Sequence, residues 1–79
     1  MAFERFLIYS LNNNRPVRVL LSGTEMKYLN LTVISMDDDS FTGLKPGRKN
    51  PLTIPYEQVL AVSYARGDSG DTTKTLFQI

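Results

Sequence analysis

Residues 27–36 read KYLNLTVISM and form the longest β-like stretch of the 79-residue chain. Leu29, Leu31 and Val33 alternate with more polar positions, and this period of two is typical of a strand with one buried face. A flat strand of this length would extend beyond short neighbours, so we expect it to bend.

Four shorter stretches have the alternation or the composition of strands. They are residues 17–21, 41–44, 52–54 and 59–64. The segments between them are predicted as turns at Ser22-Gly23-Thr24 and 37–40, a proline-containing loop at 45–51 and a 3₁₀ turn at 55–58. Five short, strongly curved strands are best closed as a small barrel, because closure limits exposed edges.

The last two strands are predicted to be the edges of this sheet. In residues 59–64, we expect Leu60, Val62 and Tyr64 to share one face. Residues 52–54 would supply the other edge. Pairing one chain's edge with the next gives a head-to-tail interface, and a closing rotation produces a homo-oligomeric ring.

A helix is predicted over residues 2–12. Phe3, Phe6, Leu7 and Leu11 follow the spacing of one apolar stripe. The asparagines at 12–14 are expected to end the helix, because asparagine tolerates the left-handed conformation. Pro16 cannot continue a helix.

We divide the chain into one domain and a tail. The domain is predicted at residues 1–65, with the helix at 2–12 and the barrel at 16–64. Residues 66–79 form a polar tail, whose apolar end at 76–79 is a candidate for a further strand.

The composition argues against catalysis. The chain has no cysteine and no histidine, so the usual nucleophile–base pairs and the commonest metal ligands are absent. We therefore expect no enzyme, no cofactor and no small-molecule substrate. No apolar run approaches the roughly 20 residues that span a bilayer, and no secretory signal is visible. A cytoplasmic location is expected.

Three consecutive carboxylates at residues 37–39 are the one candidate for a cation site. Oxygen ligands suit Ca²⁺ and Mg²⁺, but the spacing is not that of an EF-hand. Aspartate is also common in turns for backbone reasons. We predict a turn and no metal.

The pattern resembles the Sm-like fold, and most closely its bacterial branch, the Hfq RNA chaperones. The resemblance rests on Phe6-Leu7, residues 15–23 (RPVRVLLSG), Asp37 and residues 55–62 (PYEQVLAV). It implies an all-β fold, a strongly bent five-stranded SH3-like barrel of the Sm type with an N-terminal α-helix. It also implies a ring, by likeness a hexamer, that binds single-stranded RNA.

The chain departs from the family at several places, and the first two below are places where the family contacts RNA. The tyrosine of the last tight turn is followed by Glu57 and Gln58, where the Hfq proteins have lysine and histidine. Asp38, Asp39 and Ser40 stand where the wider family has an asparagine shortly after the aspartate. The family's glycine in the bent strand has no counterpart near Leu29 and Asn30, and the segment between Gly23 and Asp37 is about three residues longer than the family's.

The predicted function is therefore single-stranded RNA binding by a ring. Phosphate contacts are predicted for Arg15, Arg18, Lys45, Arg48 and Lys49, and base contacts for Tyr56 and Gln58. Tyr28 and Phe41 are also aromatic, but burial preference favours the core or a subunit interface for both. The net charge of only +1 requires a local basic patch.

An alternative stays open. The ring could be a structural or assembly protein, of phage or plasmid type, that has lost the RNA site. The three cations at residues 45–49 would then only keep a loop solvated and protect an edge. Adhesion through Arg66-Gly67-Asp68 is set aside, because nothing indicates secretion.

Overall fold

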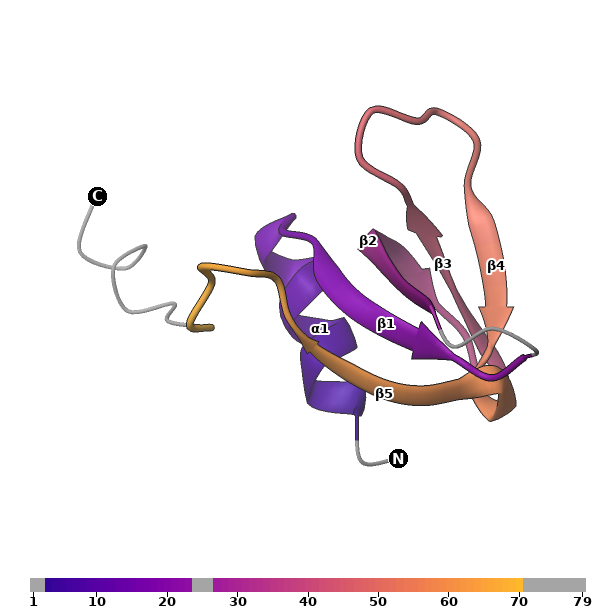
Figure 1. Cartoon of the computed structure of the whole chain (residues 1–79). Coiled ribbons are helices and arrows are strands. Elements are labelled where there is room, and N and C mark those ends of the chain that lie inside the picture. The colour runs from indigo at the N-terminus through magenta and orange to yellow at the C-terminus, as the bar shows by residue number, and fades with distance from the viewer. Residues whose placement is uncertain (1–2, 24–26, 71–79) are drawn as a thin grey trace.

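The computed structural model describes residues 3–23 and 27–70, and it shows one N-terminal helix followed by a five-stranded antiparallel sheet (Figure 1). The elements are α1 (Glu4–Asn13), β1 (Val17–Leu21), β2 (Lys27–Met36), β3 (Ser40–Leu44), β4 (Leu52–Pro55), the 3₁₀ turn η1 (Tyr56–Gln58) and β5 (Val59–Tyr64). The strand order is β4-β3-β2-β1-β5. No helix among the described residues is long and apolar enough to cross a membrane.

The predicted elements are confirmed, with small differences at their ends. β2 and β5 have the predicted bounds, whereas α1 begins and ends later than expected and β4 reaches Pro55. β4 and β5 are the two edges of the sheet, as predicted, and no ladder joins them. The candidate strand at 76–79 lies outside the described residues.

The expected bend in β2 is confirmed. Its first half pairs with β1 and its second half with β3, and the register shifts between Val33 and Ser35. Ser10 of α1 is fully buried at this point. Its hydroxyl accepts a hydrogen bond from the Val33 N–H at 2.8 Å and donates one to the Arg15 carbonyl at 2.6 Å. The helix thus satisfies a backbone donor beside the irregular part of the strand.

The helix is ended by an asparagine in the left-handed conformation, as predicted, but its buried side differs from the predicted stripe. Asn14 adopts the left-handed conformation (φ 52°, ψ 45°) and caps α1. Leu7 is fully buried, and Phe3 and Phe6 pack at the edge of the core. Leu11 is exposed, so its predicted place in the buried stripe is wrong. Tyr9 and Ser10 occupy the buried side instead.

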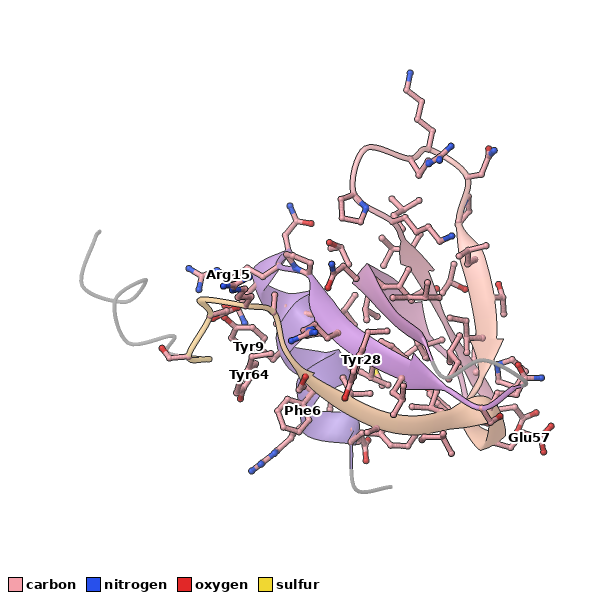
Figure 2. All side chains as sticks on the ribbon, viewed as in Figure 1. Phe6, Tyr9, Arg15, Tyr28, Glu57 and Tyr64 are labelled. Atoms are coloured by element: carbon pink, nitrogen blue, oxygen red, sulfur yellow. The ribbon has the colours of Figure 1, made fainter. Side chains whose placement is uncertain are left out.

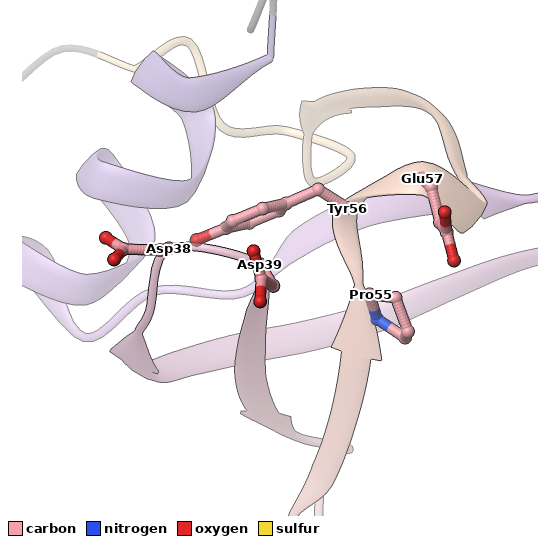
Figure 3. Close-up of a pocket in the computed structure, with 5 residues that line it drawn as sticks. All are labelled: Asp38, Asp39, Pro55, Tyr56 and Glu57. Atoms are coloured by element: carbon pink, nitrogen blue, oxygen red, sulfur yellow. The ribbon is translucent and has the colours of Figure 1, made fainter.

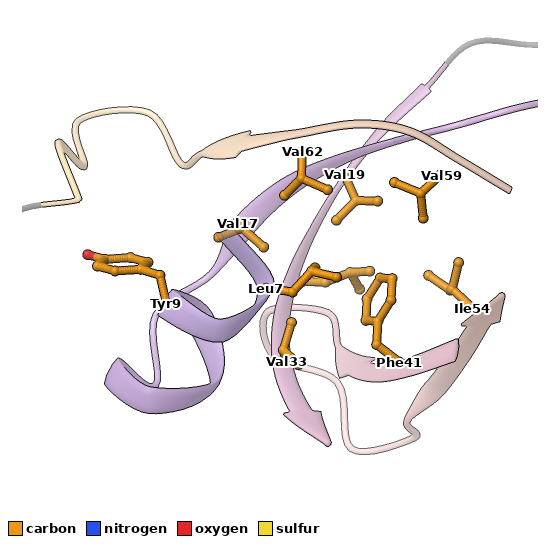
Figure 4. Close-up of a cluster of buried hydrophobic side chains, with 10 residues drawn as sticks. Leu7, Tyr9, Val17, Val19, Val33, Phe41, Ile54, Val59 and Val62 are labelled. Carbon is orange, nitrogen blue, oxygen red and sulfur yellow. The ribbon is translucent and has the colours of Figure 1, made fainter. Parts of the chain in front are cut away.

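The core lies between α1 and the concave side of the curved sheet (Figure 4). Ten buried side chains form it: Leu7, Tyr9, Val17, Val19, Leu31, Val33, Phe41, Ile54, Val59 and Val62. Every strand contributes at least one of them, so the sheet and the helix share a single core.

The predicted alternation in β5, with Leu60 on the same face as Val62, is wrong. Leu20 is paired with Ala61 and Leu21 with Val59, so Leu60 has no partner in β1 and the register shifts there. Val59 and Val62 are consequently both buried, whereas Leu60 is 51% exposed. A bulge at an edge strand therefore presents a large apolar side chain outward.

Gly43 of β3 lies close against β2 and leaves little room for a side chain. A Cβ at this position would be 3.2 Å from the Leu31 Cβ and 3.3 Å from the Thr32 carbonyl oxygen.

We expect Gly43→Ala to lower the free energy of unfolding by about 1–3 kcal/mol, because a buried strand pair must move apart. Urea denaturation followed by circular dichroism measures this. Ser63→Ala, at an exposed strand position, is the control and should leave the midpoint unchanged within error. Equal midpoints for Gly43→Ala and wild type would contradict the close packing.

Candidate nucleic-acid interface

The sheet has two ends that differ in charge. β1 and β4 begin, and β3 and β5 end, on the same side: Val17 is paired with Tyr64, and Leu52 with Gly43. We call this side the basic end; its cations are Arg15, Arg18, Lys45, Arg48, Lys49 and Arg66. The acidic end, where β2 and β4 finish, carries Asp37, Asp38, Asp39 and Glu57. Arg15 and Glu57 are labelled on opposite sides of the molecule in Figure 2.

The basic end contains a cleft of about 420 Å³. It is lined by Pro16, Arg18, Asn30, Pro46, Ala65 and Arg66. Four separate segments of the chain meet there: the start of β1, the middle of β2, the loop before β4 and the residues after β5. The cleft thus joins guanidinium groups from two segments to an amide from a third.

Two further clefts adjoin the same end. One, of about 300 Å³, shares Pro16, Ala65 and Arg66 with the first cleft and adds Arg15 and Asp68. The other, of about 290 Å³, is lined by Lys45, Arg48, Asn50 and Leu52 beside edge strand β4. All of the cations predicted to bind phosphate except Lys49 line one of these three clefts, and Lys49 lies exposed on the loop between them.

Arg15 takes part in a polar network that ties the segment after β5 to α1. The Tyr9 hydroxyl donates to the Asp68 carboxylate at 2.9 Å and accepts a hydrogen bond from the Arg15 guanidinium at 3.0 Å. Arg15 and Asp68 also form an ion pair at 3.7 Å. Burial and the hydrogen bond to Asp68 raise the pKa of Tyr9. This network fixes the course of the chain up to Gly70, whose N–H donates to Asp68.

Tyr28 lies on the exposed face of the sheet and not in the core. It is 54% exposed, and the Arg18 guanidinium lies 4.7 Å from its ring centroid. Strand register places Tyr28 opposite Leu20, which is opposite Ala61. An apolar row therefore crosses β2, β1 and β5 beside the first cleft, with Tyr28 projecting on the viewer's side in Figure 2. Exposed aromatic rings next to cations are suited to base stacking.

Tyr56 lies at the acidic end, in a cleft of about 460 Å³ with Asp38, Asp39, Pro55 and Glu57 (Figure 3). Its hydroxyl donates to the Asp37 carbonyl at 2.7 Å, and its ring stacks on Phe41 at 6.1 Å between centroids. Burial is the main cause of its raised pKa, with further contributions from the charges of Asp37, Glu4 and Asp38. These carboxylates disfavour a phosphate at this cleft.

The predicted site residues therefore separate into two groups. The five cations lie at the basic end, whereas Tyr56 and the exposed Gln58 lie at the other end of the strands. The Gln58 carbonyl accepts a hydrogen bond from Ser22 at 2.9 Å, so its backbone has a structural role. The structure does not bring the predicted base contacts together with the predicted phosphate contacts.

Residues 37–40 form the predicted turn, in which the Asp37 N–H donates to the Ser40 carbonyl at 2.8 Å. Within residues 3–23 and 27–70, no group of three or more acidic, histidine or cysteine side chains is arranged to hold a metal ion.

Two residues of the basic end were missed by sequence reasoning. Arg66 was assigned to the polar tail, but it lies two residues after the end of β5 and lines two clefts. Asn30 was named only as a position near the family's missing glycine. Its position opposite Arg18 follows from the register of β1 and β2. A cation two residues after a predicted strand was the available signal for Arg66, whereas the place of Asn30 opposite Arg18 could be known only from the register of β1 and β2.

In comparisons with known proteins, no family model matches the chain, and neither a curated protein nor a solved structure does.

Proposed function

We propose that this chain is a ring-forming, Sm-like protein that binds single-stranded RNA without catalysis. The order of one helix and five antiparallel strands is consistent with the Sm-like topology. The bent β2 and the short η1 link between the two edge strands favour closure of the sheet as a barrel.

The observation that carries the RNA proposal is the clustering of arginines around the 420 Å³ cleft, beside an exposed tyrosine. The net charge of the chain is only +1, yet the cations of the basic end are separated from the acidic turn by the length of the strands. Such segregation gives a local field that attracts phosphates although the whole chain is nearly neutral. The planar guanidinium groups of Arg18 and Arg66 suit phosphate oxygens, and Tyr28 offers a face to a base.

The ring proposal rests on the unpaired edges. β4 and β5 each have one neighbour within the chain, so each leaves backbone donors and acceptors along one side. Leu52 and Leu60, one on each edge strand, are exposed apolar side chains. Pairing β5 of one subunit with β4 of the next would satisfy the backbone and bury both leucines.

The test is fluorescence anisotropy with labelled oligo-U and oligo-A over a series of salt concentrations. We expect binding that weakens steeply with salt, because log K falls by about 0.7 per phosphate contact on single strands for each unit of log salt. The triple variant Lys45→Ala, Arg48→Ala, Lys49→Ala should reduce this slope by about 2. Glu57→Gln is a control at the acidic end, and it should not weaken binding. Absence of binding up to about 10 µM protein at low salt would exclude the RNA function.

The assembly role remains the second candidate, and the acidic cleft around Tyr56 favours it. Asp38, Asp39 and Glu57 lie at the turn where the resembled family attracts RNA. A ring that shows the expected mass and no RNA binding would support this second candidate.

A further inference from the structure

We infer that the cleft of about 420 Å³ at the basic end takes the terminal nucleotide of an RNA and recognises it by a phosphomonoester, the doubly charged phosphate that occurs only at a chain end. This inference rests on the proposed RNA function and not on the ring, because the site lies within one chain. It names a ligand class for that cleft: RNA with a phosphorylated 5′ or 3′ end.

The cleft is complete within one chain. β4 and β5 lie at opposite edges of the sheet, yet Pro46, in the loop before β4, lines the same cleft as Ala65 and Arg66, which follow β5. The bend of the sheet therefore brings these two segments together at the basic end. Clefts of about 300–1,000 Å³ hold single small ligands, so this one has room for about one nucleotide.

The two charges of the cleft have no carboxylate partner. Within residues 3–23 and 27–70, neither Arg18 nor Arg66 forms an ion pair, and no acidic residue lines the cleft. The adjoining cleft differs, because Asp68 lies in it and pairs with Arg15 at 3.7 Å. Two uncompensated guanidinium groups favour an anion with two charges over an anion with one.

This preference distinguishes the end of an RNA from its interior. An internal phosphodiester carries one negative charge, whereas a phosphomonoester carries about −1.5 to −2 at pH 7 and has three strongly accepting oxygens. Each guanidinium offers a planar fork of donors that binds two such oxygens at once. A phosphorylated end therefore gains contacts at this cleft that an internal nucleotide does not supply.

Arg18 is held in place before a ligand binds. It is half-buried, and its guanidinium lies 4.7 Å from the centroid of the Tyr28 ring. Stacking limits the rotamers of this long side chain, so less freedom is lost when a phosphate binds. Tyr28 is 54% exposed and offers a ring to the base of the bound nucleotide. Asn30, opposite Arg18 in the strand register, adds an amide donor to the cleft.

Arg66 is presented by a fixed turn. The Asp68 N–H donates to the Ala65 carbonyl at 2.9 Å, and Gly67 within this turn has a φ of 85°. The Asp68 carboxylate accepts a hydrogen bond from the Tyr9 hydroxyl of α1 at 2.9 Å. The Arg66 side chain itself is exposed, so a phosphate reaches it without displacing the core.

Fluorescence anisotropy with internally labelled oligo-U tests the inference. Three forms of one RNA are compared: with a 5′-phosphate, with a 3′-phosphate, and with hydroxyl groups at both ends. We expect at least one phosphorylated form to bind about tenfold or more tightly than the hydroxyl form, because charge-assisted contacts are worth that much. The form that binds more tightly identifies the end that the cleft takes. A methyl ester on that terminal phosphate removes one charge and should abolish most of the gain.

Two matched variants separate the cleft from the general charge of the basic end. Arg66→Gln should reduce the gain from phosphorylation to less than about twofold. Arg48→Gln removes the same charge from the cleft beside β4, so it should weaken binding of all three RNAs by a similar factor and preserve the gain. Arg18→Lys keeps the charge but loses the planar fork, and an intermediate gain is expected. Circular dichroism confirms that each variant is folded.

A gain that requires Arg66 and not Arg48 supports the inference. Equal binding of the hydroxyl and phosphorylated forms overturns it and leaves the RNA function intact. The same holds for a gain that the methyl ester retains, or that both glutamine variants reduce equally. If wild type binds none of the three RNAs at low salt, the proposed function itself is overturned, and the inference with it.

Discussion

Phe41→Ala is expected to lower the free energy of unfolding by about 3–5 kcal/mol. Phe41 is the largest fully buried side chain among the described residues, and it lies on β3 in the middle of the single core. Its ring also stacks on Tyr56, so truncation leaves a cavity and removes support from the η1 turn. A domain of 79 residues has only roughly 4–12 kcal/mol of stability in total.

Urea denaturation at fixed protein concentration measures this loss, since association would otherwise contribute to the apparent stability. Phe41→Leu is the matched control; it keeps most of the volume and should cost less than about 1.5 kcal/mol. If the alanine variant unfolds at the same urea concentration as the leucine variant, the central position of Phe41 in the core is wrong.

The helix and the strands could be predicted because the spacing of apolar residues changes from helical to alternating at recognisable places. Helical spacing stops at Asn14, whose left-handed conformation ends α1. The alternation of residues 27–36 marks β2 from end to end. In these segments local preference and tertiary packing favour the same structure.

The errors lie where a contact from elsewhere in the chain decides the outcome. Leu60 is exposed because the bulge opposite Leu20 and Leu21 shifts the phase of β5, and no signal in residues 59–64 marks that shift. Ser10 is buried because it binds the Val33 N–H beside the irregular part of β2. A serine within an apolar stripe gives no indication of such a distant partner.

The sequence predicts the cations of the candidate site, but not which residues lie together in space. The loop at 45–51 and the arginines at positions 15 and 18 are visible as charges, yet only the register brings the start of β1 and the end of β5 to one side. The same register separates Tyr56 from those cations and brings Asn30 and Arg66 to them. The resemblance to the Hfq proteins led to Tyr56 and Gln58, and the carboxylates around Tyr56 argue for Tyr28 instead.

Leu60→Lys is expected to convert the proposed ring to single chains without unfolding them. Leu60 is 51% exposed on edge strand β5 and lies outside the core, so a lysine at this position is accommodated in one chain. At a boundary between subunits, its charge would lose water against the apolar edge of the neighbour, which is costly for an unpaired ion.

Size-exclusion chromatography with light scattering should therefore show the mass fall from that of a hexamer to that of one chain at micromolar concentration. Ile34→Lys is the control, because Ile34 is also exposed and also lies at a register shift, but on the central strand β2. It should leave the mass unchanged. A wild-type mass of one chain, or an unchanged ring in Leu60→Lys, would contradict assembly through β5.

Measuring RNA binding by Leu60→Lys distinguishes the effect of losing the ring from the effect of adding a positive charge. The substitution adds a cation, so a single-chain site would bind RNA as well as before or better. Loss of the proposed ring removes the gain from simultaneous contacts with several subunits, which is worth about 100-fold or more for a long oligonucleotide. We therefore expect weaker binding despite the added positive charge, and only dependence on the ring explains a change in that direction.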